Sequence, residues 1–304
     1  MNLQSTVIAI GALSALTSIV SGNVSATTTS ANASAFVSGT TVTQSFTAGA
    51  EGTQASANQV IPSVIGAAFV SAQASSFPGA LRTVGVARTD GSPGGFQAQA
   101  SSSWTDSFVI AAPGYNSSMT GLFSGAVQVN GGLLVDFSGR TYSGAQVYAT
   151  VDIFPGTGYN GGRTVVTGSA RRLVGIDIPG IDTGNYNFFL LFSNVPFTFN
   201  QRIDISLRLA IWADVNAIDA GATGRSEANY AHTMTWSGLN SVSDQGGTLL
   251  PTYSASSTGS GFNFANATPV PEPNTVVLMG LGLLCIAQRR RLLIHLMRWR
   301  LVPG

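Results

Sequence analysis

The chain has little charge and almost no cysteine. Of its 304 residues, 9% are charged, well below the quarter that is usual for soluble domains. Its only cysteine is Cys285, in an apolar run near the C-terminus, so no disulfide can join two parts of the chain. Lysine is absent, and all 14 basic residues are arginines. Between residues 27 and 269, nine arginines stand against twelve acidic residues, and this net charge of −3 excludes the basic surface of a nucleic-acid-binding protein.

Groups that commonly carry catalysis are also scarce. His232 is the only histidine between residues 27 and 269, which leaves one candidate base for a Ser-His-Asp triad and excludes a metal site built from several histidines. No Gly-x-Ser-x-Gly motif supplies a nucleophile. Glu51 and Glu227 are the only glutamates in this range, and no spacing selects a carboxylate pair for glycoside hydrolysis from these and the ten aspartates. We therefore expect no enzymatic activity, no cofactor and no metal site.

Two further motifs are better explained as loops. Residues 156–161 match the Gly-x-Gly-x-x-Gly dinucleotide fingerprint, but residues 163–166 have a strand pattern where that fingerprint needs a helix. Asp177, Asp182 and Asn185 carry the oxygen ligands that calcium prefers, but their spacing matches no known calcium loop. We expect a solvated turn there.

Alternation of apolar and polar residues dominates residues 27–269. It is clearest over residues 146–153 and 197–211, where one face is apolar and the other is polar. Two such runs flank Asn130-Gly131-Gly132, which predicts a β-hairpin. Residues 188–192 are continuously apolar, which predicts a strand buried on both faces. With no long helical period in this range, the sequence predicts an all-β fold: a single antiparallel, jelly-roll-like β-sandwich that forms one domain.

Tryptophan supplies the candidate for ligand contact. Trp104 and Trp236 share strand parity with apolar residues, and we expect both in the core. Trp212 instead shares the parity of Arg208 on a polar strand face. It is therefore the best candidate for an exposed aromatic ring that stacks on a sugar.

The first 26 residues are typical of a secretory signal peptide. Residues 6–20 are apolar or small, and Val24-Ser25-Ala26 is a small-residue cleavage site. We expect a signal helix, export through the Sec machinery and cleavage after Ala26, although no basic residue precedes the apolar run.

The C-terminal region carries three elements in a fixed order. These are Val270-Pro271-Glu272-Pro273, an uncharged apolar run over residues 275–288, and a basic cluster of Arg289, Arg290 and Arg291. Spanning a bilayer takes roughly 20 apolar residues. The run itself has 14, and residues 292–297 can lengthen it past the arginines. We expect a transmembrane helix whose arginines stay on the cytoplasmic side of the membrane.

This three-part arrangement is similar to the PEP-CTERM sorting signal of Gram-negative bacteria. The resemblance implies recognition by exosortase, an integral-membrane enzyme, with processing near Pro271, Glu272 and Pro273. It also implies a link to exopolysaccharide, biofilm and the cell surface. The chain departs from the family pattern after the arginines, because residues 292–304 continue as a basic and apolar tail. The expected organisation is a signal peptide over 1–26, a β-sandwich over 27–269, the sorting signal over 270–291 and this tail.

Three hypotheses for function remain open. The leading one is an exported, non-enzymatic protein with a structural or adhesive role at the cell surface or in the extracellular matrix. The second is a secreted carbohydrate-binding module, in which Trp212 contacts extracellular polysaccharide. The third is a hydrolase, which requires a cleft lined by two carboxylates.

Overall fold

The computed structural model describes residues 28–37, 40–48, 53–62, 67–155, 163–174 and 180–268. The expected signal helix, its cleavage site at Ala26, the sorting motif, the membrane helix and the tail all lie outside these residues. No helix long and apolar enough to cross a bilayer occurs in the described part of the chain. What is described consists of fifteen strands: β1 (Thr28–Val37), β2 (Thr40–Ala48), β3 (Thr53–Pro62), β4 (Ala67–Phe77), β5 (Ala80–Asp90), β6 (Gly94–Ala111), β7 (Thr120–Val129), β8 (Gly132–Ser138), β9 (Thr141–Phe154), β10 (Thr164–Val174), β11 (Gly180–Asn185), β12 (Phe188–Thr198), β13 (Arg202–Ala217), β14 (Thr223–Asp244) and β15 (Ser254–Ser257).

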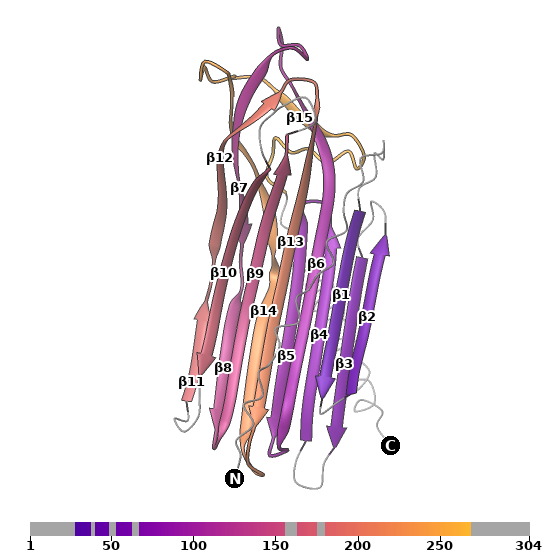
Figure 1. The fold of residues 1–304 in the computed structure, drawn as a ribbon, viewed down its shortest axis with the longest axis vertical. Helices are drawn as coiled ribbons and strands as arrows, with labels where there is room; N and C mark the ends of the chain where they lie inside the picture. Colours follow the sequence, from indigo (N-terminus) through magenta and orange to yellow (C-terminus); the bar gives the residue numbers. More distant parts are fainter. Residues whose placement is uncertain are drawn as a thin grey trace, which may run out of the picture.

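The strands form two antiparallel sheets stacked as layers (Figure 1). Sheet A has seven strands in the order β10-β9-β13-β6-β1-β2, with β15 paired to β6. Sheet B has eight strands: β11-β8-β14-β5-β4-β3 follow one another, β7 also pairs with β14, and β12 pairs with β7. The long strands run along the longest axis of the molecule, and β15 lies at one end (Figure 1). The prediction of an all-β fold with two antiparallel sheets is confirmed.

The alternation read from the sequence builds the core between the sheets. In β13 every second residue from Ile203 to Val215 is buried, while the intervening residues face outward. Trp104 and Trp236 are fully buried, as expected. They belong to an aromatic cluster in which the Phe264 ring lies 4.3 Å from Phe108, 5.5 Å from Trp104 and 5.4 Å from Trp236. Apolar burial of this kind is the dominant favourable term in folding.

The hairpin predicted around Asn130 is wrong. β7 and β8 do not pair with each other: both pair antiparallel with β14 and follow one another along it. Gly131 serves a different purpose, because a Cβ on this residue would lie 2.3 Å from Cδ1 of Tyr230. The chain therefore needs glycine there for close approach of a buried aromatic ring, rather than for a reversal of direction.

The link between β7 and β8 is one of three interruptions that lie side by side across sheet B. β14 shifts register between Tyr230 and Met234, opposite the link between β7 and β8. On the far side, Tyr186 and Asn187 separate β11 from β12, which pair with β8 and β7 respectively. Hydrogen bonds join the links, because Tyr186 N donates to Gly131 O over 2.9 Å and Gly131 N donates to Asn187 Oδ1 over 3.0 Å. We call this row the transverse break.

The strand predicted over residues 188–192 exists, but it is not buried on both faces. Leu190 and Phe192 are buried, whereas Phe189 and Leu191 are 56% and 64% exposed. β12 is bonded on one side only, to β7, so it lies at an edge where one face meets solvent. The long alternation over residues 197–211 is also interrupted, because the chain leaves sheet B at Thr198 and enters sheet A at Arg202.

Candidate functional site

Trp212 lies on the outer face of sheet A, in the middle of β13. Its neighbours across the sheet are Gln99 on β6 and Gln146 on β9. The side chain is half-buried, and its Nε1 atom is covered by protein without a hydrogen-bond partner among the described residues. The ring thus turns its polar edge away from water and presents carbon surface, which is the part of an aromatic residue that stacks on a sugar ring or another planar group.

Tyr148 is a second aromatic residue on this face, and the sequence did not single it out. It lies on β9 opposite Ala210 of β13, so Trp212 is its diagonal neighbour. Diagonal neighbours in a sheet are about 7–8 Å apart, within reach of aromatic side chains. Tyr148 is 41% exposed, and the residues opposite it, Ala210 and Ser169, are small.

Two arginines flank Tyr148 on its two neighbouring strands. Arg208 of β13 and Arg171 of β10 are both diagonal to it, and both side chains face outward. Among the described residues, neither guanidinium forms an ion pair with a carboxylate. We call Tyr148, Arg171, Arg208 and Trp212 the Tyr148 patch.

Asp214 is the acidic group closest in the strand register to this patch, two residues beyond Trp212 on β13. Burial raises the pKa of its carboxyl from the ordinary 3.8 to about 6, and the positive charge of Arg171 partly offsets that rise. The two arginines outnumber the one carboxylate, so the charge around Tyr148 is net positive. Below about pH 6 Asp214 takes up a proton, and the net positive charge increases.

Hydroxyl groups fill the rest of this outer face. Thr105 donates a hydrogen bond to Ser206 across β6 and β13, with 3.2 Å between the oxygens. Many of the side chains around the patch are short, so the rings and arginines of the patch project beyond them. These short polar residues include Ser101, Ser103, Thr150, Thr167 and Ser169. An extended surface that carries a few rings and many hydroxyls can hold a long chain across several strands.

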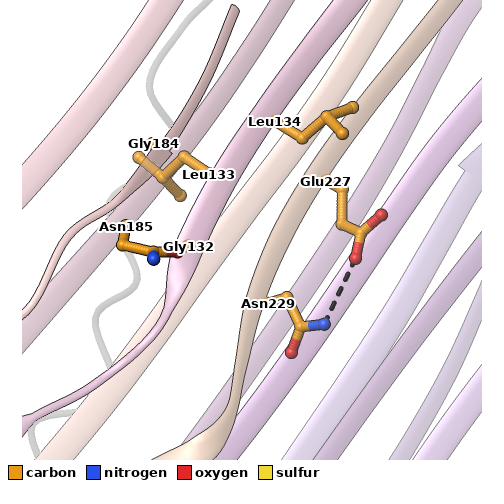
Figure 2. A pocket seen from close by; sticks show the side chains of 7 residues that line it. All are labelled: Gly132, Leu133, Leu134, Gly184, Asn185, Glu227 and Asn229. Atoms are coloured by element: carbon orange, nitrogen blue, oxygen red, sulfur yellow. Dashed lines mark hydrogen bonds between the residues drawn. The ribbon is translucent and has the colours of Figure 1, made fainter.

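Sheet B carries a pocket next to the transverse break (Figure 2). It has a volume of about 400 Å³ and is lined by Gly132, Leu133, Leu134, Gly184, Asn185, Glu227 and Asn229. Glu227 is the one carboxylate among these lining residues. It accepts hydrogen bonds from Arg225 over 2.6 Å and from Asn229 over 3.2 Å, and Figure 2 draws the second of these. With its oxygens already paired, this carboxylate has no acidic partner in the pocket with which to share glycoside chemistry.

A second pocket of about 570 Å³ lies further along sheet B, between β3, β4 and β5. None of its described lining residues is a carboxylate, and its polar lining comes from Gln54, Ser56, Gln73, Ser75, Arg82 and Thr83. Both pockets thus lie on the sheet opposite the one that carries the Tyr148 patch.

The remaining candidate residues are scattered or lie outside the described chain. Glu51, Asp177 and the glycine-rich stretch 156–161 are outside it. His232 falls in the irregular part of β14 between Tyr230 and Met234, outside the described side chains. Asp182 and Asn185, expected in a turn, instead belong to strand β11. Within the described residues, no three His, Cys, Asp or Glu side chains gather as metal ligands would.

The segment that leads to the sorting motif is fastened to the core. After β15, Phe262 and Phe264 insert beside Trp104, with centroid distances of 5.2 and 5.5 Å. Trp236 Nε1 donates to Phe264 O over 2.8 Å, and Thr268 N donates to Trp236 O over 2.8 Å. We call residues 254–268 the C-terminal strap. It lies at the β15 end of the sandwich (Figure 1) and ends one residue before the family match described next.

The comparison with known families gives one match. Residues 269–291 match the PEP-CTERM protein-sorting motif. The chain carries a PEP-CTERM motif. No curated protein and no solved structure matches the chain. The motif supports an exported protein that associates with the membrane, is processed by exosortase and reaches the cell surface. It covers Val270, Pro271, Glu272, Pro273 and the three arginines Arg289, Arg290 and Arg291, which sequence reasoning had chosen.

Proposed function

We propose that this protein works at the cell surface or in the extracellular matrix of a Gram-negative bacterium as a non-enzymatic structural or adhesive component of exopolysaccharide or biofilm. The single observation that carries the proposal is the PEP-CTERM motif at residues 269–291. Sec-dependent export and cleavage after Ala26 belong to the same proposal.

The sorting step is tested by removing the basic cluster. In the full-length chain, Arg289, Arg290 and Arg291 are changed together to glutamine. Because arginines beside a membrane segment hold its orientation, we expect at least a fivefold loss of surface delivery and build-up of unprocessed chain in the inner membrane. Surface labelling of intact cells and mass spectrometry of the carboxyl end measure both effects.

The matched control changes Arg298 and Arg300 to glutamine. These arginines also belong to the C-terminal region but lie outside the matched motif. The control removes two charges without touching the cluster, so we expect near-normal delivery. Normal delivery of the triple variant would overturn the proposed sorting route.

A carbohydrate-binding role is the second candidate function. The observation that favours it is the pair of aromatic side chains on one outer sheet face: Trp212 is half-buried and Tyr148 is 41% exposed. Aromatic rings of this kind stack on the apolar face of a sugar ring. This candidate shares the exported location of the first and differs in naming a ligand.

A further inference from the structure

We propose that the Tyr148 patch binds an acidic polysaccharide, that is, a sugar polymer that carries carboxylate groups. The inference deepens the function proposed above and rests on it for the location of the protein. The argument uses four side chains from three adjacent strands, β10, β9 and β13, which share one outer face.

The geometry of the patch is a line with an aromatic residue at its centre. Arg208 and Arg171 lie on opposite sides of Tyr148, each displaced by one strand and two residues. With about 4.8 Å between strands and about 3.3 Å per residue, their Cα atoms are roughly 16 Å apart. Trp212 lies at the level of Arg171, two strands away. Two cations separated by a ring can contact successive units of one extended polymer.

The charges determine the class of polymer. Guanidinium groups match carboxylates in geometry and donate charge-assisted hydrogen bonds to them. Other outward arginines of the two sheets are already paired: Arg88 bonds Asp90 over 2.9 Å, Arg225 bonds Glu227 over 2.6 Å, and Arg202 bonds Asp204 over 2.6 Å. The arginines of the Tyr148 patch form no such pair with a described carboxylate, so an external carboxylate can take that position.

The rings and hydroxyls determine that the ligand is a sugar. Tyr148 offers an exposed ring, and Trp212 offers carbon surface while its N–H edge is covered. Aromatic faces pack against the apolar side of a ring-shaped ligand, and the surrounding serines and threonines supply donors and acceptors for its hydroxyls. Because the patch spreads over three strands of one outer sheet face, with its two arginines roughly 16 Å apart, the ligand is an extended polymer rather than a small molecule.

The test measures binding of the purified full-length chain, held in mild detergent, to polygalacturonate. Fully methyl-esterified polygalacturonate is the matched neutral ligand, since it keeps the backbone and removes the charge. The variants are Tyr148→Ala and the double variant Arg171→Gln with Arg208→Gln. The control is Arg88→Gln with Arg225→Gln, which removes the same charge from the outer face of sheet B. Thermal melting confirms that each variant is folded.

We expect the wild-type chain to bind polygalacturonate and to bind the methyl ester at least tenfold more weakly. Both patch variants should weaken polygalacturonate binding at least tenfold, while the control stays within twofold of wild type. The inference is overturned if the wild type does not bind, if the ester binds equally well, or if the control loses as much affinity as the patch variants. Because the assay uses purified protein, it can fail while sorting succeeds, and sorting can fail while binding succeeds.

Discussion

Arginines on the outer sheet faces are used in two opposite ways. Arg88 and Arg225 on sheet B and Arg202 on sheet A each pair with an acidic residue two positions further along the same strand. On sheet A, Arg171 and Arg208 face outward beside Tyr148 without an ion pair to a described carboxylate. Residues two apart on a strand share a face, so pairing at this spacing neutralises the face locally.

The difference shows which arginines an external carboxylate can bind without displacing an internal partner. An ion pair on an exposed strand already satisfies its guanidinium, so an incoming carboxylate must first displace the internal partner. An unpaired guanidinium next to an exposed ring requires no such displacement. In a chain with only 9% charged residues, the pairing of a few arginines therefore decides which part of the outer surface is available for recognition.

The largest expected effect comes from the transverse break in sheet B. In Gly131→Ala, the new Cβ would lie 2.3 Å from the Tyr230 ring and 2.6 Å from Asn229 O. Neither a buried ring nor a backbone atom can move away freely, so we expect a loss of about 3 kcal/mol in the free energy of unfolding. Denaturant unfolding followed by tryptophan fluorescence measures this loss.

The matched control for that prediction is on sheet A. A Cβ on Gly95 would meet no atom within 4 Å, so Gly95→Ala should leave the free energy of unfolding nearly unchanged. Equal effects of the two variants would show that the break does not depend on close approach at Gly131.

The next effect concerns Asp214 on sheet A. Its folded-state pKa of about 6 exceeds the ordinary 3.8, so the folded protein retains a proton that the unfolded chain has lost between these pH values. Stability therefore falls as pH rises through that window, and the penalty persists above it. In Asp214→Asn, we expect a gain on the order of 3 kcal/mol at pH 8, since the pKa rises by about two units and each unit is worth about 1.4 kcal/mol.

The pH dependence distinguishes this cause from a general effect of the substitution. Below pH 4 the carboxyl is protonated in both states, so the gain should shrink toward zero there. Urea unfolding of wild type and variant at several pH values gives the comparison. A gain that is equal at pH 3.5 and pH 8 would contradict the raised pKa.

The smallest effect comes from the exposed ion pair between Arg88 and Asp90. Both side chains are about half exposed, at 52% and 49%, and their nearest atoms are 2.9 Å apart. Pairs of this kind contribute less than about 1 kcal/mol and are screened by salt. We expect Arg88→Gln to lower the melting temperature slightly in dilute buffer, with the difference disappearing in 1 M salt. A large, salt-independent loss would show that Arg88 does more on sheet B than pair with Asp90.

The sequence was informative where burial alone decides the structure. Alternation along β13 identified the inner face from Ile203 to Ile211, and parity alone placed Trp104 and Trp236 in the core. Turn chemistry was less reliable, because glycine serves both chain reversal and close packing. Gly131 serves the second purpose, and only the position of Tyr230 in space reveals it.

The candidate site was predictable only in part, for a related reason. Parity put Trp212 on the polar face of its strand, where the structure has it. It could also have put Tyr148 on the outer face of β9. It could not show that β9 lies between β13 and β10, which is what brings Arg208 and Arg171 to either side of Tyr148. Strand order in a sheet depends on long-range pairing, which local patterns do not encode.

The C-terminal strap has a consequence for the product of processing. Its hydrogen bonds reach Thr268, and the glutamate of the motif is Glu272. Four residues extend no further than about 14 Å. A cut near that glutamate would leave the rings of Phe262 and Phe264 packed against Trp104, with only a short segment of chain beyond Thr268. Anything joined to that segment would be held within a few residues of Trp236 and of the turn between β4 and β5, the two places to which Thr268 is bonded.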